Sequence, residues 1–145
     1  MPRFSKTSLA RLGTCDARLR AVCHAAIAEV DFVVVCGHRD QAEQERVYVE
    51  GKSRVRWPDS RHNSLPSLAV DLAPCDARGR IDWQDIAAFK ALAVVVAARA
   101  RDLGVSIEWG GDWARFRDYP HFQVTGPALD EWPRASVTVN TTHGR

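Results

Sequence analysis

The chain has 145 residues, of which 46% are hydrophobic and 26% charged, values typical of one globular domain. Its formal net charge of +2 is too small to favour nucleic acid as a partner. We expect a single domain over residues 1–145, with the core over about 4–124 and a polar tail over 125–145. The longest apolar run, Ala91–Ala98, is too short to cross a membrane, so no stable membrane insertion is expected.

The first half of the chain predicts helices and one buried strand. Residues 8–12 favour a short helical turn that stops at a glycine. Apolar positions at helical spacing predict an amphipathic helix over 16–30, and the β-branched run 32–36 predicts a strand. Residues 41–50 are rich in helix formers and end at Gly51.

The second half begins with a polar, basic loop over 51–66, long enough to indicate a functional segment. A short strand over 67–72 follows, and the clearest helix then runs to Gly104, with Asp82 as its expected cap and Asp85 in its first turn. Two further strands are expected over 105–109 and 119–124.

The order of these elements indicates the fold class. Helices and short strands follow one another without regular βαβ alternation. We therefore predict an α+β fold with a small antiparallel sheet flanked by helices.

The cysteines are Cys15, Cys23, Cys36 and Cys75, and no two of them are spaced as C-x-x-C. A zinc knuckle and a thioredoxin-like motif are therefore excluded. We expect four free thiols, most of them small core residues.

The first candidate site is formed by His62 in the basic loop and Asp71 in the strand that follows. Nitrogen and oxygen ligands of this kind suit Zn²⁺. A carboxylate within Leu-Ala-Val-Asp-Leu-Ala would be half buried and would need a cation, a metal or several donors. Pairing of Asp71 with an arginine, or capping of a turn, explains the same pattern equally well.

The second candidate site is the pair Asp118 and His121, separated by a proline-stiffened turn. In a hydrolytic metal site the imidazole would bind the metal while the carboxylate moves a proton. Taken alone, so short a motif favours a surface carboxylate and a structural histidine. His38 could line the same cleft as a spare ligand, whereas His24 and His143 are expected to be structural or solvated.

Other chemistries are not supported by the sequence. It contains no glycine-rich phosphate loop, no G-x-S-x-G motif and no H-E-x-x-H motif. Basic residues at 52, 54, 56 and 61 favour an anionic substrate over nucleic acid, because Trp57 alone could stack with bases among them.

Several motifs occur together in a characteristic order: V-C-G-H-R-D at 35–40, S-x-H at 60–62, A-x-D at 69–71, E-W-G-G-D-W at 108–113 and D-x-P-H-F at 118–122. In this combination the chain resembles the zinc D,D-carboxypeptidase and L-alanyl-D-glutamate peptidase family, with phage endolysins of the latter type closest in size. The resemblance implies the α+β fold shared by Hedgehog and D-Ala-D-Ala peptidase domains.

The resemblance also implies residue roles. His62, Asp71 and His121 match the zinc ligands, and Asp118 matches the catalytic acid/base. Arg39 matches a substrate-binding arginine able to steady an oxyanion, and Ser60 a small polar residue beside the first ligand, which we assign to substrate binding. One departure is the spacing from His62 to Asp71, which is two residues longer than in the common motif. The other is His38, at a position that is often aromatic.

The implied function is cleavage of the L-alanyl-D-glutamate bond of peptidoglycan stem peptides by a phage endolysin during host lysis. Such a protein would be made in the host cytoplasm, be released through a pore formed by another protein, and act as a monomer on the cell wall in the periplasm. The alternatives are a D,D-carboxypeptidase or D-Ala-D-Ala dipeptidase, and a catalytically inactive zinc-containing module that binds the cell wall.

Overall fold

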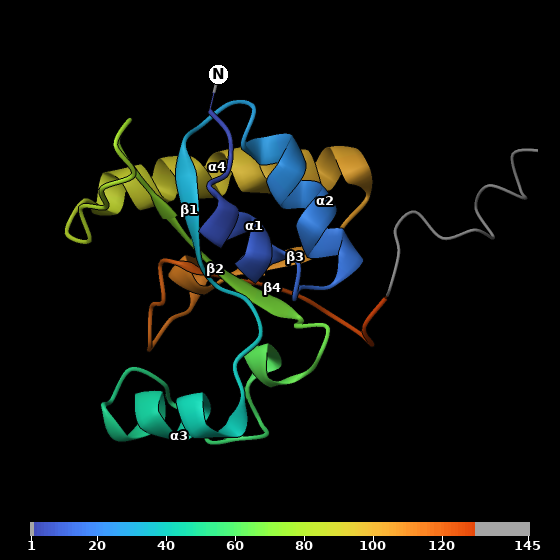
Figure 1. Ribbon diagram of the computed structural model, residues 1–145, viewed down its shortest axis with the longest axis vertical. Coiled ribbons are helices and arrows are strands. Elements are labelled where there is room, and N and C mark those ends of the chain that lie inside the picture. Colours follow the sequence, from blue (N-terminus) through green and yellow to red (C-terminus); the bar gives the residue numbers. More distant parts are fainter. Residues whose placement is uncertain (1, 130–145) are drawn as a thin grey trace, which may run out of the picture.

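The computed structural model describes residues 2–129 and contains four helices, four strands and two 3₁₀ turns. The helices are α1 (Lys6–Leu12), α2 (Ala17–Ala26), α3 (Gln41–Val49) and α4 (Ile86–Leu103). The strands are β1 (Phe32–Cys36), β2 (Ala69–Pro74), β3 (Ile107–Trp109) and β4 (His121–Val124), and the 3₁₀ turns are η1 (Arg61–Asn63) and η2 (Gly110–Asp112). In Figure 1, α3 and η1 lie at one end of the molecule, away from α1, α2 and α4.

The four strands form one antiparallel sheet in the order β1-β2-β4-β3. Asp71 of β2 lies opposite His121 of β4 and also opposite Cys36 of β1, where an irregularity follows Val34. The predicted α+β fold with a small antiparallel sheet is therefore confirmed.

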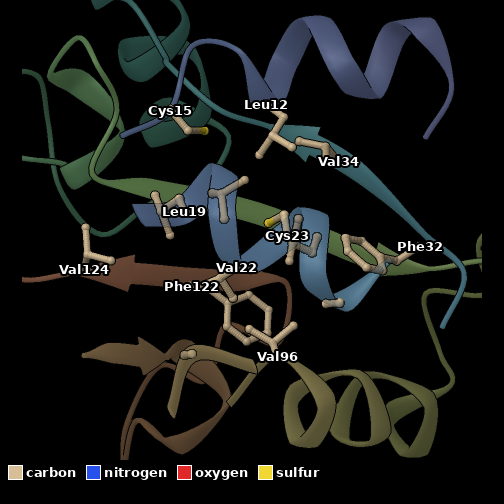
Figure 2. Close-up of a cluster of buried hydrophobic side chains, with 14 of the residues drawn as sticks. Leu12, Cys15, Leu19, Val22, Cys23, Phe32, Val34, Val96, Phe122 and Val124 are labelled. Atoms are coloured by element: carbon tan, nitrogen blue, oxygen red, sulfur yellow. The ribbon is translucent and has the colours of Figure 1, made fainter. Parts of the chain in front are cut away.

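One face of the sheet carries the hydrophobic core. Val70 and Leu72 of β2 belong to the core cluster, together with Phe122 and Val124 of β4. Figure 2 shows Phe122 beside Val22 of α2 and Val96 of α4, the two helices that cover this face. Because side chains alternate along a strand, the residues between these apolar positions face the other way. That second face carries the polar residues described below.

The ends of several elements differ from the sequence predictions. Helix α2 ends at Ala26 rather than near Val30. The cap of α4 is Asp85, whose side chain accepts from the Ala88 N–H, and not Asp82. Strand β2 begins two residues later than expected, because Ser67 forms an isolated bridge with Cys15 outside the sheet.

All four cysteines are free in the described part of the chain. Cys15 and Cys23 are buried in the core, and burial raises the pKa of the Cys15 thiol to about 12. The prediction of free thiols that are small core residues is therefore confirmed for these two, and a thiol that stays protonated is a weak nucleophile and metal ligand. Cys36 is only partly buried and lies beside His62, which the sequence did not indicate.

The first residues of the expected polar tail pack against the start of α2. Arg18 donates to the carbonyl oxygens of Thr125 and Pro127, and the Leu129 N–H donates to Asp16 Oδ2 at 2.6 Å. The rest of the tail, including His143, lies outside the described residues. None of the helices found between residues 2 and 129 has the length and apolarity needed to cross a membrane.

Candidate active site and metal centre

His62 is held by the 3₁₀ turn η1 at the end of the basic loop. The Ser60 side chain caps this turn by accepting from the His62 N–H at 3.2 Å. The imidazole is 2% exposed, and its Nδ1 lies 2.7 Å from the Gly37 carbonyl oxygen. Because a carbonyl can only accept, Nδ1 carries the proton and Nε2 points toward Asp71, with Oδ1 at 3.2 Å.

His121 has a matching arrangement on the neighbouring strand. Its Nε2 lies 2.7 Å from Gln123 Oε1, which it reaches as a donor, and its Nδ1 faces Asp71 Oδ1 at 3.5 Å. The Asp118 carboxylate lies 3.9 Å from the same Nδ1. Gln123, which sequence reasoning missed, alternates with the core residues Phe122 and Val124 and therefore shares the face of His121.

These atoms fit a metal site. His62 and His121 each donate one ring N–H to a side-chain or backbone oxygen, the usual support for a metal-binding histidine. Their other nitrogens approach Asp71 Oδ1 at 3.2 and 3.5 Å, close to the roughly 3.3 Å that ligand atoms adopt around tetrahedral zinc. Within residues 2–129, two groups able to hold a metal share Asp71. One joins it to Cys36 and His62 and the other to Asp118 and His121, so the two imidazoles belong to different groups.

Electrostatics within the cluster also favour a cation. Burial alone would lower the pKa of His62, but the Asp71 carboxylate raises this pKa to about 10. Burial opposes ionisation of Asp71, yet the two histidines hold the pKa of that carboxyl far below its usual range. Burial and the negative charge of Asp71 raise the pKa of Asp118, which suits a group that must both accept and return a proton.

Arg39 contacts the other oxygen of the shared carboxylate. Its Nη2 lies 3.4 Å from Asp71 Oδ2, and its Nη1 donates to Gln44 Oε1 at 3.1 Å. Gln44 is fully buried, and its amide nitrogen donates to Ser53 Oγ and to the Val55 carbonyl oxygen. Arg39 therefore orients Asp71 as well as facing the cleft, and Gln44 ties this arginine to the basic loop.

An open cleft of about 400 Å³ lies over this cluster. It is lined by all six residues to which the resemblance assigns roles: Arg39, Ser60, His62, Asp71, Asp118 and His121. The longer spacing between His62 and Asp71 therefore does not keep the two side chains apart. Sequence reasoning missed the aromatic wall of the cleft, formed by Trp83, Trp113 and Phe116, because isolated aromatic residues carry no local signal of what they face.

His38 does not join the cluster. Its Nδ1 lies 3.0 Å from the Ser64 carbonyl oxygen, and the residue is absent from the cleft lining. The expectation that His38 lines the cleft as a spare ligand is therefore wrong. The reason is that the chain turns after Gly37, which directs His38 away from the face that bears Asp71.

The first glycine of the E-W-G-G motif, Gly110, lies where the structure has no room for a side chain. A Cβ atom at this position would lie 2.3 Å from the Asp118 carbonyl oxygen and 3.0 Å from the Cβ of His121. The Asp118 N–H also donates to the Gly110 carbonyl oxygen at 3.0 Å. The close approach of the two backbone segments sets the position of Asp118 beside His121.

We predict that Gly110→Ala lowers kcat/KM by about a hundredfold, because small displacements of reacting groups have effects of that order. Steady-state kinetics on a soluble stem peptide would measure it. Gly13→Ala is the matched control, since a Cβ there would meet only carbonyl oxygens at 3.4 Å. Equal activity of the Gly110 and Gly13 variants would contradict the positioning role.

The fold and the cleft together define a class of protein. A small α+β domain with two imidazoles that contact one carboxylate, and a second carboxylate of raised pKa in the same cleft, is typical of a metal-dependent hydrolase. Comparison with known proteins shows to which family within this class the chain belongs.

The sequence model of the phage L-alanyl-D-glutamate peptidase family matches residues 1–133. The chain is 31% identical over 119 residues to the L-alanyl-D-glutamate peptidase of Escherichia phage T5, covering 81% of this chain and 85% of that protein. It is 34% identical over 111 residues to the peptidoglycan L-alanyl-D-glutamate endopeptidase CwlK of Bacillus subtilis (strain 168), covering 69% of this chain and 64% of CwlK.

A solved structure agrees with these sequence matches. The crystal structure of the L-Ala D-Glu endopeptidase ChiX of Serratia marcescens superposes with a TM-score of 0.73 at 34% identity, covering 85% of this chain and 90% of ChiX. The chain belongs to the phage L-alanyl-D-glutamate peptidase family. It is therefore a peptidase, and the resemblance drawn from the motifs is confirmed.

Proposed function

We propose that this protein is a zinc-dependent endopeptidase that hydrolyses the bond between L-alanine and D-glutamate in peptidoglycan stem peptides. The observation that carries the proposal is the presence of Asp118 beside the His62–Asp71–His121 cluster in one cleft of a chain of this family. The names of the T5, CwlK and ChiX relatives support the choice of bond.

Zinc is the metal that the donor set fits best. His62 Nε2, Asp71 Oδ1 and His121 Nδ1 would hold it, and three protein ligands leave a fourth position free, as in catalytic zinc sites. When bound, the metal supplies Lewis-acid polarisation of the scissile carbonyl and lowers the pKa of water. Arg39 would orient Asp71 through its second oxygen.

Asp118 is the proposed acid/base. Its side chain is 32% exposed, so a water molecule and a substrate can both reach it. It accepts a proton as the oxygen of water adds to the alanine carbonyl carbon, and it returns that proton to the glutamate nitrogen as the C–N bond breaks. Arg39 and Ser60 line the same cleft, where Arg39 would donate to the developing oxyanion and Ser60 would contact the peptide.

The biological role we propose is that of a phage endolysin. The phage origin of the family and of the T5 relative supports this role. The protein would be made in the host cytoplasm, leave it through a pore formed by another protein, and act as a monomer on the wall.

Product analysis tests the proposed bond. Purified peptidoglycan is digested with the protein, and the products are identified by mass spectrometry and N-terminal labelling. We expect new D-glutamate amino termini and chains that end in L-alanine. Release of free D-alanine would instead support a carboxypeptidase, and binding to the polymer without new termini would indicate an inactive module.

A further inference from the structure

Four arginine and lysine side chains in the described part of the chain line the cleft, and Arg54 differs from the other three in its contacts. Arg39 contacts Asp71, Lys52 pairs with Glu50 at 3.2 Å, and Arg61 donates to the carbonyl oxygens of Val124 and Gly126. Arg54 has no hydrogen-bond or ion-pair partner among residues 2–129. Its guanidinium carbon lies 4.5 Å from the centre of the Phe116 ring.

This position over the Phe116 ring leaves the donors of Arg54 available. A guanidinium is attracted to an aromatic face through its charge, and none of the five N–H groups of Arg54 has an acceptor among residues 2–129. Contact with the ring restricts the side chain without satisfying any donor. The planar fork of donors matches a carboxylate, which it can bind through two parallel hydrogen bonds.

The contact also joins two walls of the cleft. Arg54 belongs to the basic loop that leads to His62, and Phe116 lies two residues before Asp118. An anion bound by Arg54 would therefore be held within the same cleft as the proposed acid/base. The same loop also brings the exposed charges of Lys52 and Asp59 to the cleft. Lys52 is paired with Glu50, and Asp59 would repel an anion placed next to it.

The substrate chemistry supplies an anion of the right kind; this step rests on the proposed function. A glutamyl residue on the amine side of the scissile bond has two carboxyl groups, and only one of them carries the peptide onward. The other is a free carboxylate a few bonds away from the nitrogen that leaves. Amidation of that carboxylate removes its charge and replaces one oxygen with a donor group.

We propose that Arg54, seated on Phe116, is a specificity-determining residue that binds the free carboxylate of the D-glutamyl residue. The enzyme then prefers stem peptides in which this carboxylate is free to peptides in which it is amidated. The same contact aligns the substrate with Asp118, because Phe116 and Asp118 lie on one short loop.

Two synthetic N-acetylated stem peptides that differ only in a free or amidated D-glutamyl carboxyl group test the proposal. We would measure kcat and KM on both for the wild type, Arg54→Gln and Arg54→Lys. Arg78→Gln, in an exposed turn away from the cleft, is the matched control. Circular dichroism would confirm that all variants are folded.

We expect the wild type to prefer the free carboxylate by about tenfold to a hundredfold, the range for one charge-assisted hydrogen-bonded pair. In Arg54→Gln this ratio of kcat/KM values should fall toward one, mainly through KM on the free peptide. Arg54→Lys should give an intermediate ratio, since it keeps the charge but not the fork. Arg78→Gln should keep the wild-type ratio.

Two results are informative in opposite ways. Cleavage of both peptides with a ratio that Arg54→Gln leaves unchanged would overturn the role of Arg54 and leave the proposed function intact. Failure of the wild type to cleave either peptide between alanine and glutamate would overturn the proposed function, and this inference with it.

Discussion

Asp118→Asn is expected to lower kcat by about a hundredfold to ten-thousandfold while the protein still binds one equivalent of metal. General acid–base catalysis contributes effects of this size. Asparagine has nearly the same shape as aspartate but cannot accept and return a proton. The variant therefore separates proton transfer from metal binding, which the proposed roles assign to different residues. Steady-state kinetics on a stem peptide and metal analysis of the dialysed protein would measure both quantities.

The control for this variant is Asp102→Asn. Asp102 lies in α4, is exposed and pairs with Arg99, so its loss removes one negative charge without touching the cleft. We expect it to keep wild-type kcat. Retained cleavage in Asp118→Asn would exclude Asp118 as the acid/base, and loss of bound metal would assign it to the metal instead.

Removal of the metal by a chelator is expected to abolish measurable turnover, and added Zn²⁺ should restore it. His62→Ala should abolish turnover as well, but without rescue by Zn²⁺, because one of the three proposed ligands is missing. His24→Gln is the control, since His24 packs against Phe4 outside the cleft. A chelated enzyme that keeps full activity would overturn the metal-dependent mechanism.

Metal binding should also release protons. In the metal-free protein the pKa of His62 is raised to about 10, so the imidazole is protonated at pH 7 and must lose its proton to bind a metal. We expect release of about one proton for each zinc bound at pH 7, with affinity that falls as the pH falls. Calorimetry in buffers of different ionisation enthalpy measures the number of protons.

The stability of the metal-free protein should depend on pH with a defined sign. The pKa of His62 is higher in the folded protein than the ordinary value of 6.5. The protonated imidazole therefore stabilises the folded protein fully below pH 6.5, and this stabilisation is lost as the pH rises through 10. The pKa of Asp71 is lowered in the folded protein. The ionised carboxylate therefore stabilises the folded protein above the ordinary pKa of 3.8, and this stabilisation is lost at acid pH. The melting temperature of the chelated protein, measured across this range, should be highest between these limits.

Local patterns in the sequence were sufficient for the elements that they describe. The apolar spacing of α2 and α4 and the β-branched run of β1 identified these elements, because both signals arise within a few residues of each other. Their ends were harder to predict. Asp82 and Asp85 are both suitable caps, and only the backbone conformation at Asp85 decides which one begins α4.

The candidate site depended on residues far apart in the chain. The spacing of His62 and Asp71 alone supported metal binding and a purely structural role of Asp71 equally, and the short motif at His121 favoured a structural role for that histidine. Only the resemblance carried by the ordered set of motifs placed the three residues in one site. In the structure, the register of β2 and β4 brings two of these residues together, because it places Asp71 opposite His121. Such pairing between strands is not encoded in either segment by itself.

The sequence by itself determined the kinds of residue available for chemistry, the main helices, the fold class and the family. Only the tertiary structure decided that His38 turns away, that Gln123 and Gly37 support the imidazoles, and that the Arg54 guanidinium lies over the Phe116 ring. The reason is that hydrogen bonds and ring contacts of this kind join loops and strands distant in the chain. Their partners are therefore set by how the sheet and the basic loop pack, and not by neighbouring residues.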